Sequence, residues 1–285
     1  MSLPLDTGKS RLRRRSRASW SVILCVVVIV IVALLALLGH LIAPQDPRAQ
    51  MTSLGMSGPS ADHWLGTDQL GRDIFSRLIV GGRTAFVGPL IIAACSLVIG
   101  DLLGLVAGYY GRWVDSLIMR WVDLMWSIPS LLVVIVVAGA FGGGYWLAIG
   151  LLIVLVIPMD VRVVRGAALE QAPRPYVESA KTLGVSNFRI LVSHIWPNVA
   201  PVAVANAFLI FATALVSLSG LSFLGLGVNP GTPDWGLMLA ENLSLLFVSP
   251  VAALAPGVMI VLTAASMNVV GDWIYERLSE RGASR

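Results

Sequence analysis

Long apolar segments constrain this sequence more than any other feature. The first runs almost unbroken from Trp20 to Ile42, and about 20 apolar residues suffice for a helix to cross the hydrocarbon core of a bilayer. With 56% hydrophobic and only 13% charged residues, the chain lies outside the range of soluble domains. We therefore predict an all-α integral membrane protein with six transmembrane helices. The other five apolar runs are at 84–107, 118–140, 145–159, 199–226 and 249–270.

Basic residues indicate the orientation of these helices. A cluster from Lys9 to Arg17 directly precedes the first apolar run, and Lys and Arg gather on the cytoplasmic side of membrane proteins. If this end is inside, six crossings leave only four of the 20 Lys and Arg residues outside, namely Arg48, Arg72, Arg77 and Arg83. Both termini are therefore predicted to be cytoplasmic, with the basic cluster near anionic lipid.

A cleaved signal peptide is the alternative for the first apolar run. The run is longer than an ordinary signal-peptide core, and no convincing small-residue cleavage site follows it. We therefore expect an uncleaved first helix.

The longest polar interruption in the second half of the chain lies at 174–197. Pro175 can begin a helix, because the N–H that proline lacks is not needed there, and Gly184 can end the helix in a left-handed conformation. Ser186 is a candidate N-cap for a second short helix. That second helix carries four apolar residues: Phe188, Ile190, Leu191 and Ile195.

The first of these short helices has one apolar face. Apolar residues recur on it at helical spacing, with Glu178 and Lys181 on another side. The apolar residues are Tyr176, Val177, Ala180 and Leu183. We expect this face to fit a groove on a partner protein.

The same interruption resembles the EAA loop of the membrane subunits of bacterial ABC importers. The family pattern is Glu-Ala-Ala, three residues, Gly, nine residues and Ile-x-Leu-Pro. Its spacing is intact here, although Ser179, His194 and Trp196 replace the usual residues. In that family the loop is a cytoplasmic coupling helix that inserts into the ATPase subunit. The resemblance implies that the ATPase-coupling residues are Tyr176, Val177, Glu178, Ser179, Ala180, Lys181, Leu183 and Gly184.

A second set of residues resembles one branch of these importers, the dipeptide/oligopeptide/nickel permeases, and its second-permease (C-type) subunit. The likeness extends from Pro44 to about Asp272, although the Asp-Pro-Arg expected soon after Asp272 is missing. The first part comprises His63, Leu65, Gly66, Thr67, Asp68, Gly71, Arg72, Asp73, Ser76, Arg77 and Arg83. The second part comprises Gly225, Leu226, Gly227, Pro233, Asp234, Trp235, Gly236, Asn268 and Gly271.

These resemblances imply a type I ABC importer permease fold in the bacterial inner membrane. An apolar stripe at Ile74, Phe75, Leu78 and Ile79 also predicts a helix lying in the membrane interface. The expected organisation is a basic cytoplasmic N-tail (1–19), a first transmembrane helix (20–43), an extracytoplasmic segment with an interfacial helix (44–83), a five-helix permease core (84–272) that includes the coupling loop (170–198), and a cytoplasmic C-tail (273–285).

The implied function is that of a permease subunit forming half of the pathway for di- or oligopeptides in an ATP-driven importer. The implied partners are a second homologous permease, two ATPase subunits and an extracytoplasmic solute-binding protein. A nickel or other small-solute importer is the alternative within the family, and a secondary transporter is the alternative outside it. Intramembrane charge is sparse; Asp101 is a candidate for the translocation path, and a structural contact is its other explanation.

Motifs for catalysis, cofactors and metals are not evident. Gly8-Lys9-Ser10 resembles the end of a phosphate-binding loop, but Leu3 stands where its first glycine belongs. The three histidines have no metal-ligand spacing, and the two cysteines lie in apolar runs. Residues 180–186 also imitate a DNA-binding helix-turn-helix, or a purely structural hairpin. Because long apolar runs flank them on both sides, we expect no nucleic-acid partner.

Overall fold

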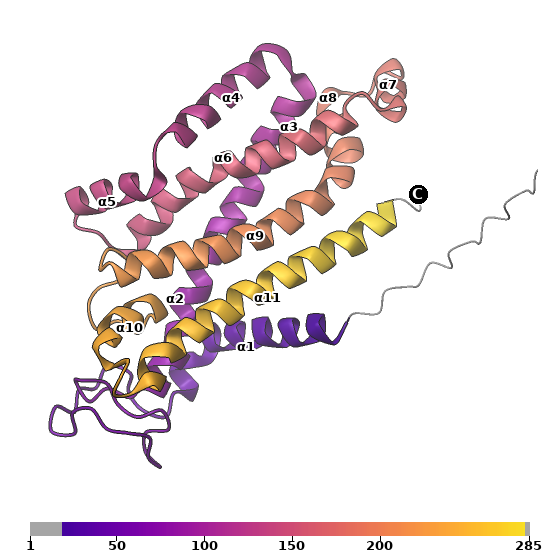
Figure 1. Ribbon diagram of the computed structural model, residues 1–285. Helices are drawn as coiled ribbons and strands as arrows, with labels where there is room; N and C mark the ends of the chain where they lie inside the picture. Colours follow the sequence, from indigo (N-terminus) through magenta and orange to yellow (C-terminus); the bar gives the residue numbers. More distant parts are fainter. Residues whose placement is uncertain (1–18, 283–285) are drawn as a thin grey trace, which may run out of the picture.

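The computed structural model describes residues 19–282, and these form a bundle of helices (Figure 1). Within this range, β geometry occurs only as an isolated bridge between Thr67 and Asp73. The basic cluster before Trp20 and the last residues of the C-tail lie outside the described residues. The helices are α1 (Trp20–Ile42), α2 (Ile74–Cys95), α3 (Asp101–Tyr110), α4 (Arg112–Ser127), α5 (Ser130–Phe141), α6 (Tyr145–Gln171), α7 (Pro175–Thr182), α8 (Asn187–Ile190), α9 (Trp196–Phe223), α10 (Trp235–Glu241) and α11 (Pro250–Gly282), with π-helical turns η1 (Ser96–Gly100) and η2 (Leu191–Ile195) and a 3-10 turn η3 (Leu243–Leu245).

Five helical segments of the described chain are long and apolar enough to cross a membrane. A sixth crossing is obtained when α4 and α5, which meet at an angle of 79°, are taken as one bent span. The prediction of an all-helical protein with six spans is confirmed on that basis. The five segments are Trp20–Ile42, Ile74–Tyr110, Tyr145–Gln171, Asn187–Phe223 and Pro250–Glu280.

The third expected span, at 118–140, is not a single straight helix. It is broken between α4 and α5 at Ile128 and Pro129. Proline lacks an N–H and disfavours helical geometry in the residue before it. Ile128 is accordingly extended, with φ −101° and ψ 126°. The break turns the chain sharply at this point.

The fourth span is much longer than the run 145–159 suggests, because α6 continues to Gln171. The polar residues that follow the apolar run have partners on neighbouring helices. Arg165 forms an ion pair with Asp115, and Arg162 bonds to Asp123 while its guanidinium lies 4.2 Å from the centre of the Trp126 ring. These contacts extend α6 beyond its apolar part.

The interfacial helix expected within 44–83 is instead the first part of α2. Asp73 is its N-cap and accepts a hydrogen bond of 2.7 Å from the Ser76 N–H. Ile74 and Leu78 are buried in a cluster that includes Trp235. A stripe that looked suited to lipid therefore packs against protein.

α3 and α6 pack closely along a row of glycines that begins at the end of η1 and continues on α3. Gly100, Gly104 and Gly108 recur every fourth residue and face α6. A Cβ on Gly104 would lie 2.8 Å from the Cβ of Val164, and one on Gly108 would lie 2.6 Å from the Cβ of Ala168. Small residues at this spacing allow membrane helices to approach closely. We call this contact the α3–α6 seam.

The two ends of the bundle carry different structures. α9 runs between α6 and α11, and α4 and α5 lie alongside α6 (Figure 1). α7 and α8 project at one end, which we call the α7 end, and α10 and the segment 43–73 cover the opposite end, the α10 end (Figure 1). The candidate coupling loop is thus separated from the α10 end by the length of the bundle.

Candidate coupling loop

α7 begins and ends where the sequence predicts. Arg174 is its extended N-cap, and Pro175 occupies the first helical position. At its C-terminus, Gly184 has φ +75°. The Gly184 N–H donates to the Lys181 carbonyl at 3.0 Å, and the Val185 N–H donates to the Ala180 carbonyl at 3.1 Å. This pair of bonds is the Schellman motif, which satisfies the last carbonyls of a helix.

The second short helix is only partly as predicted. Ser186 is the N-cap residue of α8, but its side chain makes no capping hydrogen bond. α8 is four residues long and continues through η2 into the long helix α9. It is therefore the start of a membrane-spanning segment. A recognition helix of a DNA-binding module must enter a groove, and this one is fixed to the bundle.

The prediction that the apolar residues of α7 form one surface for a partner is wrong, because some of them are buried within this chain. Val177 and Ala180 are buried within this chain, whereas Leu183 is 81% exposed. Val177 and Ala180 are three residues apart and face inward, and Leu183 comes after the last helical turn. The most exposed large apolar side chains of the loop are Leu183 and Phe188, at 81% and 75%.

The buried side of α7 is part of an apolar cluster that extends to the α3–α6 seam. Val177 and Ala180 belong to the same apolar cluster as Leu105 of α3 and Val164 and Ala168 of α6. Residues of α8, η2 and α9 complete this cluster: Ile190, Leu191, Ile195, Val199 and Ala203. Burial of each valine, leucine or isoleucine side chain of this cluster stabilises the packing by about 1.5–3 kcal/mol. A displacement of α7 therefore disturbs a cluster that also contains residues of α3 and α6.

Polar contacts add to this attachment. The Tyr176 hydroxyl donates to Gln171 Oε1 at 2.9 Å, and burial raises the pKa of Tyr176, so the phenol keeps its proton. The Tyr109 hydroxyl donates to Asn187 Oδ1 at 2.8 Å. Lys181 Nζ lies 5.0 Å from the centre of the Tyr109 ring, within range of a cation–π contact. α3, α6, α7 and α8 are thus linked by side chains.

The outward side of α7 is polar up to Leu183. Glu178, Ser179, Lys181 and Thr182 are all exposed. The Ser179 hydroxyl donates to the Pro175 carbonyl and the Thr182 hydroxyl to the Glu178 carbonyl, both at 2.9 Å. We call Glu178, Ser179, Lys181, Thr182 and Leu183 the α7 tip.

Asp101 is far from open solvent. It is 3% exposed and lies at the start of α3, against Asp160 of α6. One polar cavity, with a volume of about 380 Å³, is lined by Asn206, Asn268, Asp272 and Tyr275 together with apolar residues of α6 and α9. The structure brings Asp101 into the α3–α6 seam and not into the coupling loop.

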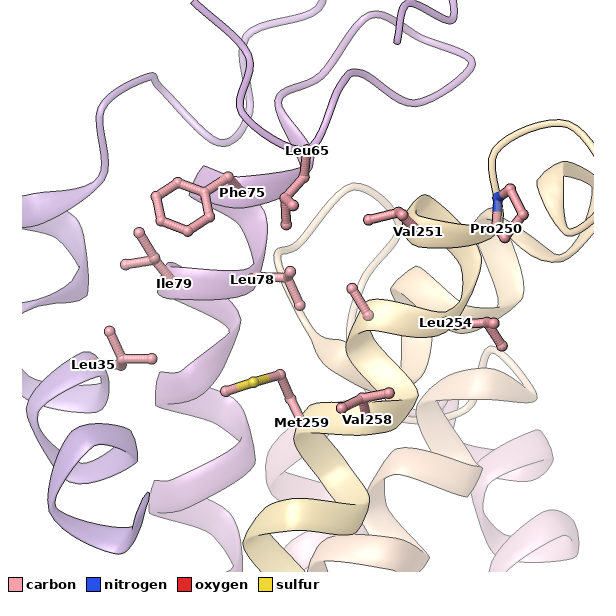
Figure 2. A pocket seen from close by; sticks show the side chains of 11 residues that line it. Leu35, Leu65, Phe75, Leu78, Ile79, Pro250, Val251, Leu254, Val258 and Met259 are labelled. Atoms are coloured by element: carbon pink, nitrogen blue, oxygen red, sulfur yellow. The ribbon is translucent and has the colours of Figure 1, made fainter. Parts of the chain in front are cut away.

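An apolar groove with a volume of about 500 Å³ lies near the α10 end. Figure 2 shows side chains of α1, α2 and α11 around it, among them Leu35, Ile79 and Met259. Its lining residues are all apolar. Such a surface offers no group that orients a charged solute.

The α10 end is held by buried charges whose partners the sequence did not reveal. Arg72 bonds to Asp68 at 2.6 Å and to Glu241 at 2.7 Å, and Arg77 bonds to the same Glu241 oxygen at 2.7 Å. His63 Nδ1 lies 3.0 Å from Asp73 Oδ1. Motif residues before and within α2 are thereby tied to the end of α10.

α10 itself is fixed at its N-terminus. Asp234 accepts a hydrogen bond of 3.0 Å from the Leu237 N–H, and burial raises the pKa of this carboxyl. The Trp235 indole N–H donates to the Leu78 carbonyl at 2.9 Å. The motif around Trp235 therefore explains how α10 is held against α2.

Comparison with known proteins agrees with this architecture. Residues 100–282 match the family model described as "Binding-protein-dependent transport system inner membrane component". The chain belongs to this family. Its members are membrane transport components that work with ATPase and solute-binding partners, and this permease is accordingly a multi-span protein of the inner membrane.

Three relatives align with most of the permease. It is 34% identical over 259 residues to the dipeptide transport system permease protein of Alkalihalophilus pseudofirmus, covering 91% of this chain and 85% of the relative. It is 37% identical over 224 residues to the glutathione transport system permease protein of Pectobacterium atrosepticum, covering 79% and 74%. It is 34% identical over 259 residues to the probable D,D-dipeptide transport system permease protein of Escherichia coli K12, covering 91% and 87%.

A solved structure shares the fold. The inward-facing MetNI methionine ABC transporter matches with a TM-score of 0.57 and 19% identity, covering 71% of the permease and 96% of the matched chain. The type I importer fold implied by the sequence is therefore confirmed.

Proposed function

We propose that this permease subunit forms half of the pathway for short peptides in an ATP-driven importer and is moved through the α7 tip. The observation that carries the coupling role is the two-sided structure of α7. Its inner side is packed on the α3–α6 seam, and its outer side presents polar residues and Leu183. A partner that pushes on Leu183 moves the seam as well.

The cargo follows from the relatives. Dipeptides and glutathione, the solutes named for them, are all short peptides or peptide derivatives. A nickel or other small-solute importer is the alternative within the family. We assign the peptide class and not a particular peptide, because selectivity also depends on the solute-binding partner.

Energy comes from the partner subunits in this proposal. Two ATPase subunits close on ATP, and the permease, which catalyses no reaction, converts their movement into a change of access. A second homologous permease completes the pathway, and a solute-binding protein delivers the peptide to the α10 end. The α7 end is then cytoplasmic, together with both termini. To shift access from 1:99 to 99:1, the ATP-bound state must favour one conformation by about 5.5 kcal/mol.

The cargo is tested by uptake. Cells that lack this chain receive wild type or an empty vector, and accumulation of labelled di- and tripeptides is measured. Restored uptake of at least one peptide by wild type is expected. If wild type co-purifies with an ATPase but restores no peptide uptake, while nickel uptake is restored, the peptide assignment is wrong.

The coupling role is tested separately with Leu183→Asp. The charge should weaken a contact with an apolar groove, so we expect less co-purified ATPase and less uptake, with normal amounts of permease in the membrane. Leu243→Asp is the matched control, because Leu243 is also strongly exposed but lies at the α10 end. Equal ATPase recovery from both variants would contradict the role of the α7 tip.

A further inference from the structure

Two carboxyl groups meet inside the bundle at the α3–α6 seam. Asp101 and Asp160 are 3% and 1% exposed, and their side chains lie within hydrogen-bonding reach of each other. Both lie on segments long enough to span the membrane. The Asn206 amide of α9 donates to Asp160 Oδ1. Three membrane helices therefore converge on this pair.

If both carboxyl groups were ionised, the pair would have more buried acceptor oxygens than hydrogen-bond donors to satisfy them. Both oxygens of Asp101 and Oδ2 of Asp160 are buried and make no hydrogen bond within the described chain. Within residues 19–282, neither carboxyl forms an ion pair with a Lys, Arg or His side chain. Ionised carboxylates only accept hydrogen bonds, and two such charges side by side in a desolvated site repel strongly.

A buried serine lies next to the pair. Ser96 is fully buried beside Asp160, and its hydroxyl makes no hydrogen bond in the described chain. Ser96 begins η1, a π-helical turn that ends directly before Asp101. Such turns inside helices are frequent at functional sites.

A proton is favoured over a metal cation as the neutralising ligand, because no group of three or more His, Cys, Asp or Glu side chains among the described residues could hold a metal ion. Gly100 approaches the Asp160 side chain so closely that an added Cβ would lie 2.9 Å from the Asp160 Cβ. A bound cation needs oxygen atoms arranged around it at about 2.0–2.6 Å. A proton shared between two oxygens requires no such space.

We propose that Asp101 and Asp160 bind one proton between them and form a carboxylic acid–carboxylate hydrogen bond that fastens α3 to α6. The proton makes one group a donor to the other, so the pair carries one negative charge, which the Asn206 amide stabilises. This hydrogen bond lies one helical turn before Leu105 and Val164, which belong to the same apolar cluster as the buried residues of α7. Loss of the proton therefore loosens the seam that carries the coupling loop.

The surrounding groups are consistent with exchange of this proton. η1 contributes Ser96 and α9 contributes Asn206, neither of which titrates in this range. Asn206 also lines the polar cavity, where α11 contributes Asp272 and Tyr275. Asn206 is therefore shared between this cavity and the pair, since its amide donates to Asp160.

Infrared spectroscopy tests the proposal directly. The full importer is purified in D₂O buffer at neutral pH, and wild-type spectra are compared with those of Asp101→Asn and Asp160→Asn. Each substitution is expected to remove one band of a protonated carboxyl, because the Asn amide supplies the donor and leaves the remaining carboxyl ionised. Asp123→Asn is the control, since this side chain is 63% exposed, and it should remove only a band of an ionised carboxylate.

The outcomes separate the possible states of the pair. If Asp101→Asn removes the acid band but Asp160→Asn does not, the proton belongs to Asp101 alone and the shared proton is refuted. If both variants remove only ionised carboxylate, and wild-type thermal stability depends on sodium, a bound cation replaces the proton and the proposal fails.

A measurement on wild type covers the case in which the variants do not assemble. Raising the pH of the intact importer should abolish the acid band and lower its thermal stability in the same pH range. An acid band that is absent at neutral pH would overturn the proposal without any substitution.

Discussion

The two ends of this bundle are held by different kinds of interaction. At the α10 end, the nearly fully buried Arg72 and Arg77 share Glu241, so charges removed from water fix the positions of α2 and α10. At the α7 end, Val177 and Ala180 are held by apolar packing on the seam, and the charged residues lie outside. Ion pairs need exact geometry to offset desolvation, whereas apolar surfaces tolerate small shifts. We therefore expect α2 and α10 to keep their relative positions during transport, and α7 to move together with α3 and α6.

The largest loss of stability is expected on substitution of Glu241, the carboxylate that Arg72 and Arg77 share at the α10 end. Glu241→Gln leaves two buried guanidinium groups without their common counter-charge, and breaking a buried pair costs about 3–5 kcal/mol. Thermal unfolding of the purified importer should show this loss. Gln69→Ala removes an exposed hydrogen bond to Ser244 at the same end and serves as the control, with little change expected. Equal stability of the two variants would show that the charges do not hold this end.

The next effect is expected at the seam. Gly104→Ala places a Cβ 2.8 Å from the Cβ of Val164, and overpacking of this kind costs about 1–3 kcal/mol. Uptake should fall along with stability, because the seam carries α7. Gly150→Ala on α6 is the matched control, since nothing lies within 4 Å of its added Cβ. If Gly104→Ala behaves like this control, close packing of α3 on α6 is not required.

A smaller effect is expected at the end of α7. Gly184→Ala meets no atom within 4 Å, so its cost comes only from the positive φ of +75°. A left-handed conformation costs a non-glycine residue about 1–2 kcal/mol. Gly166→Ala, also in open space but without positive φ, isolates this strain. We expect less co-purified ATPase from Gly184→Ala than from wild type, and no change from Gly166→Ala. If Gly166→Ala instead lost more ATPase than Gly184→Ala, the Schellman turn would not position the tip.

The smallest effect is expected at the N-cap of α8. Ser186→Ala removes a side chain that makes no capping bond, so the stability should change by about 0.5 kcal/mol or less. Asp234→Ala is the contrasting variant at the α10 end, where the side chain does cap a helix. It should cost about 1 kcal/mol or more in thermal unfolding. A large loss on Ser186→Ala would reveal a capping contact in the assembled importer.

Local signals in the sequence predicted much of this molecule. The first helix, predicted at 20–43, spans Trp20–Ile42 and so coincides with the continuous apolar run. The ends of α7 were predictable because Pro175 and Gly184 each satisfy a backbone requirement at one position. Pro129 favours a break between α4 and α5, but the apolar residues on both sides of it led to the prediction of one continuous span.

Features that depend on partners distant in the sequence were not predictable. The length of α6 is set by Asp115 and Asp123 on α4, and the inward direction of Val177 is set by residues of α3, α6 and α9. The contact of Asp101 with Asp160 joins residues on two separate apolar runs. Periodicity describes which residues share a face, but it does not say which neighbour covers that face.

Photo-crosslinking from position 183 is the sharpest test of the α7 tip as the surface that contacts the ATPase. A photoreactive amino acid replaces Leu183, or Leu243 as the control, in cells that express the whole importer. We expect a covalent product between the permease and its ATPase from position 183 and none from position 243. An ATPase product from position 243, or its absence from position 183 in a complex that still contains ATPase, would contradict the assignment of the α7 tip as the coupling surface.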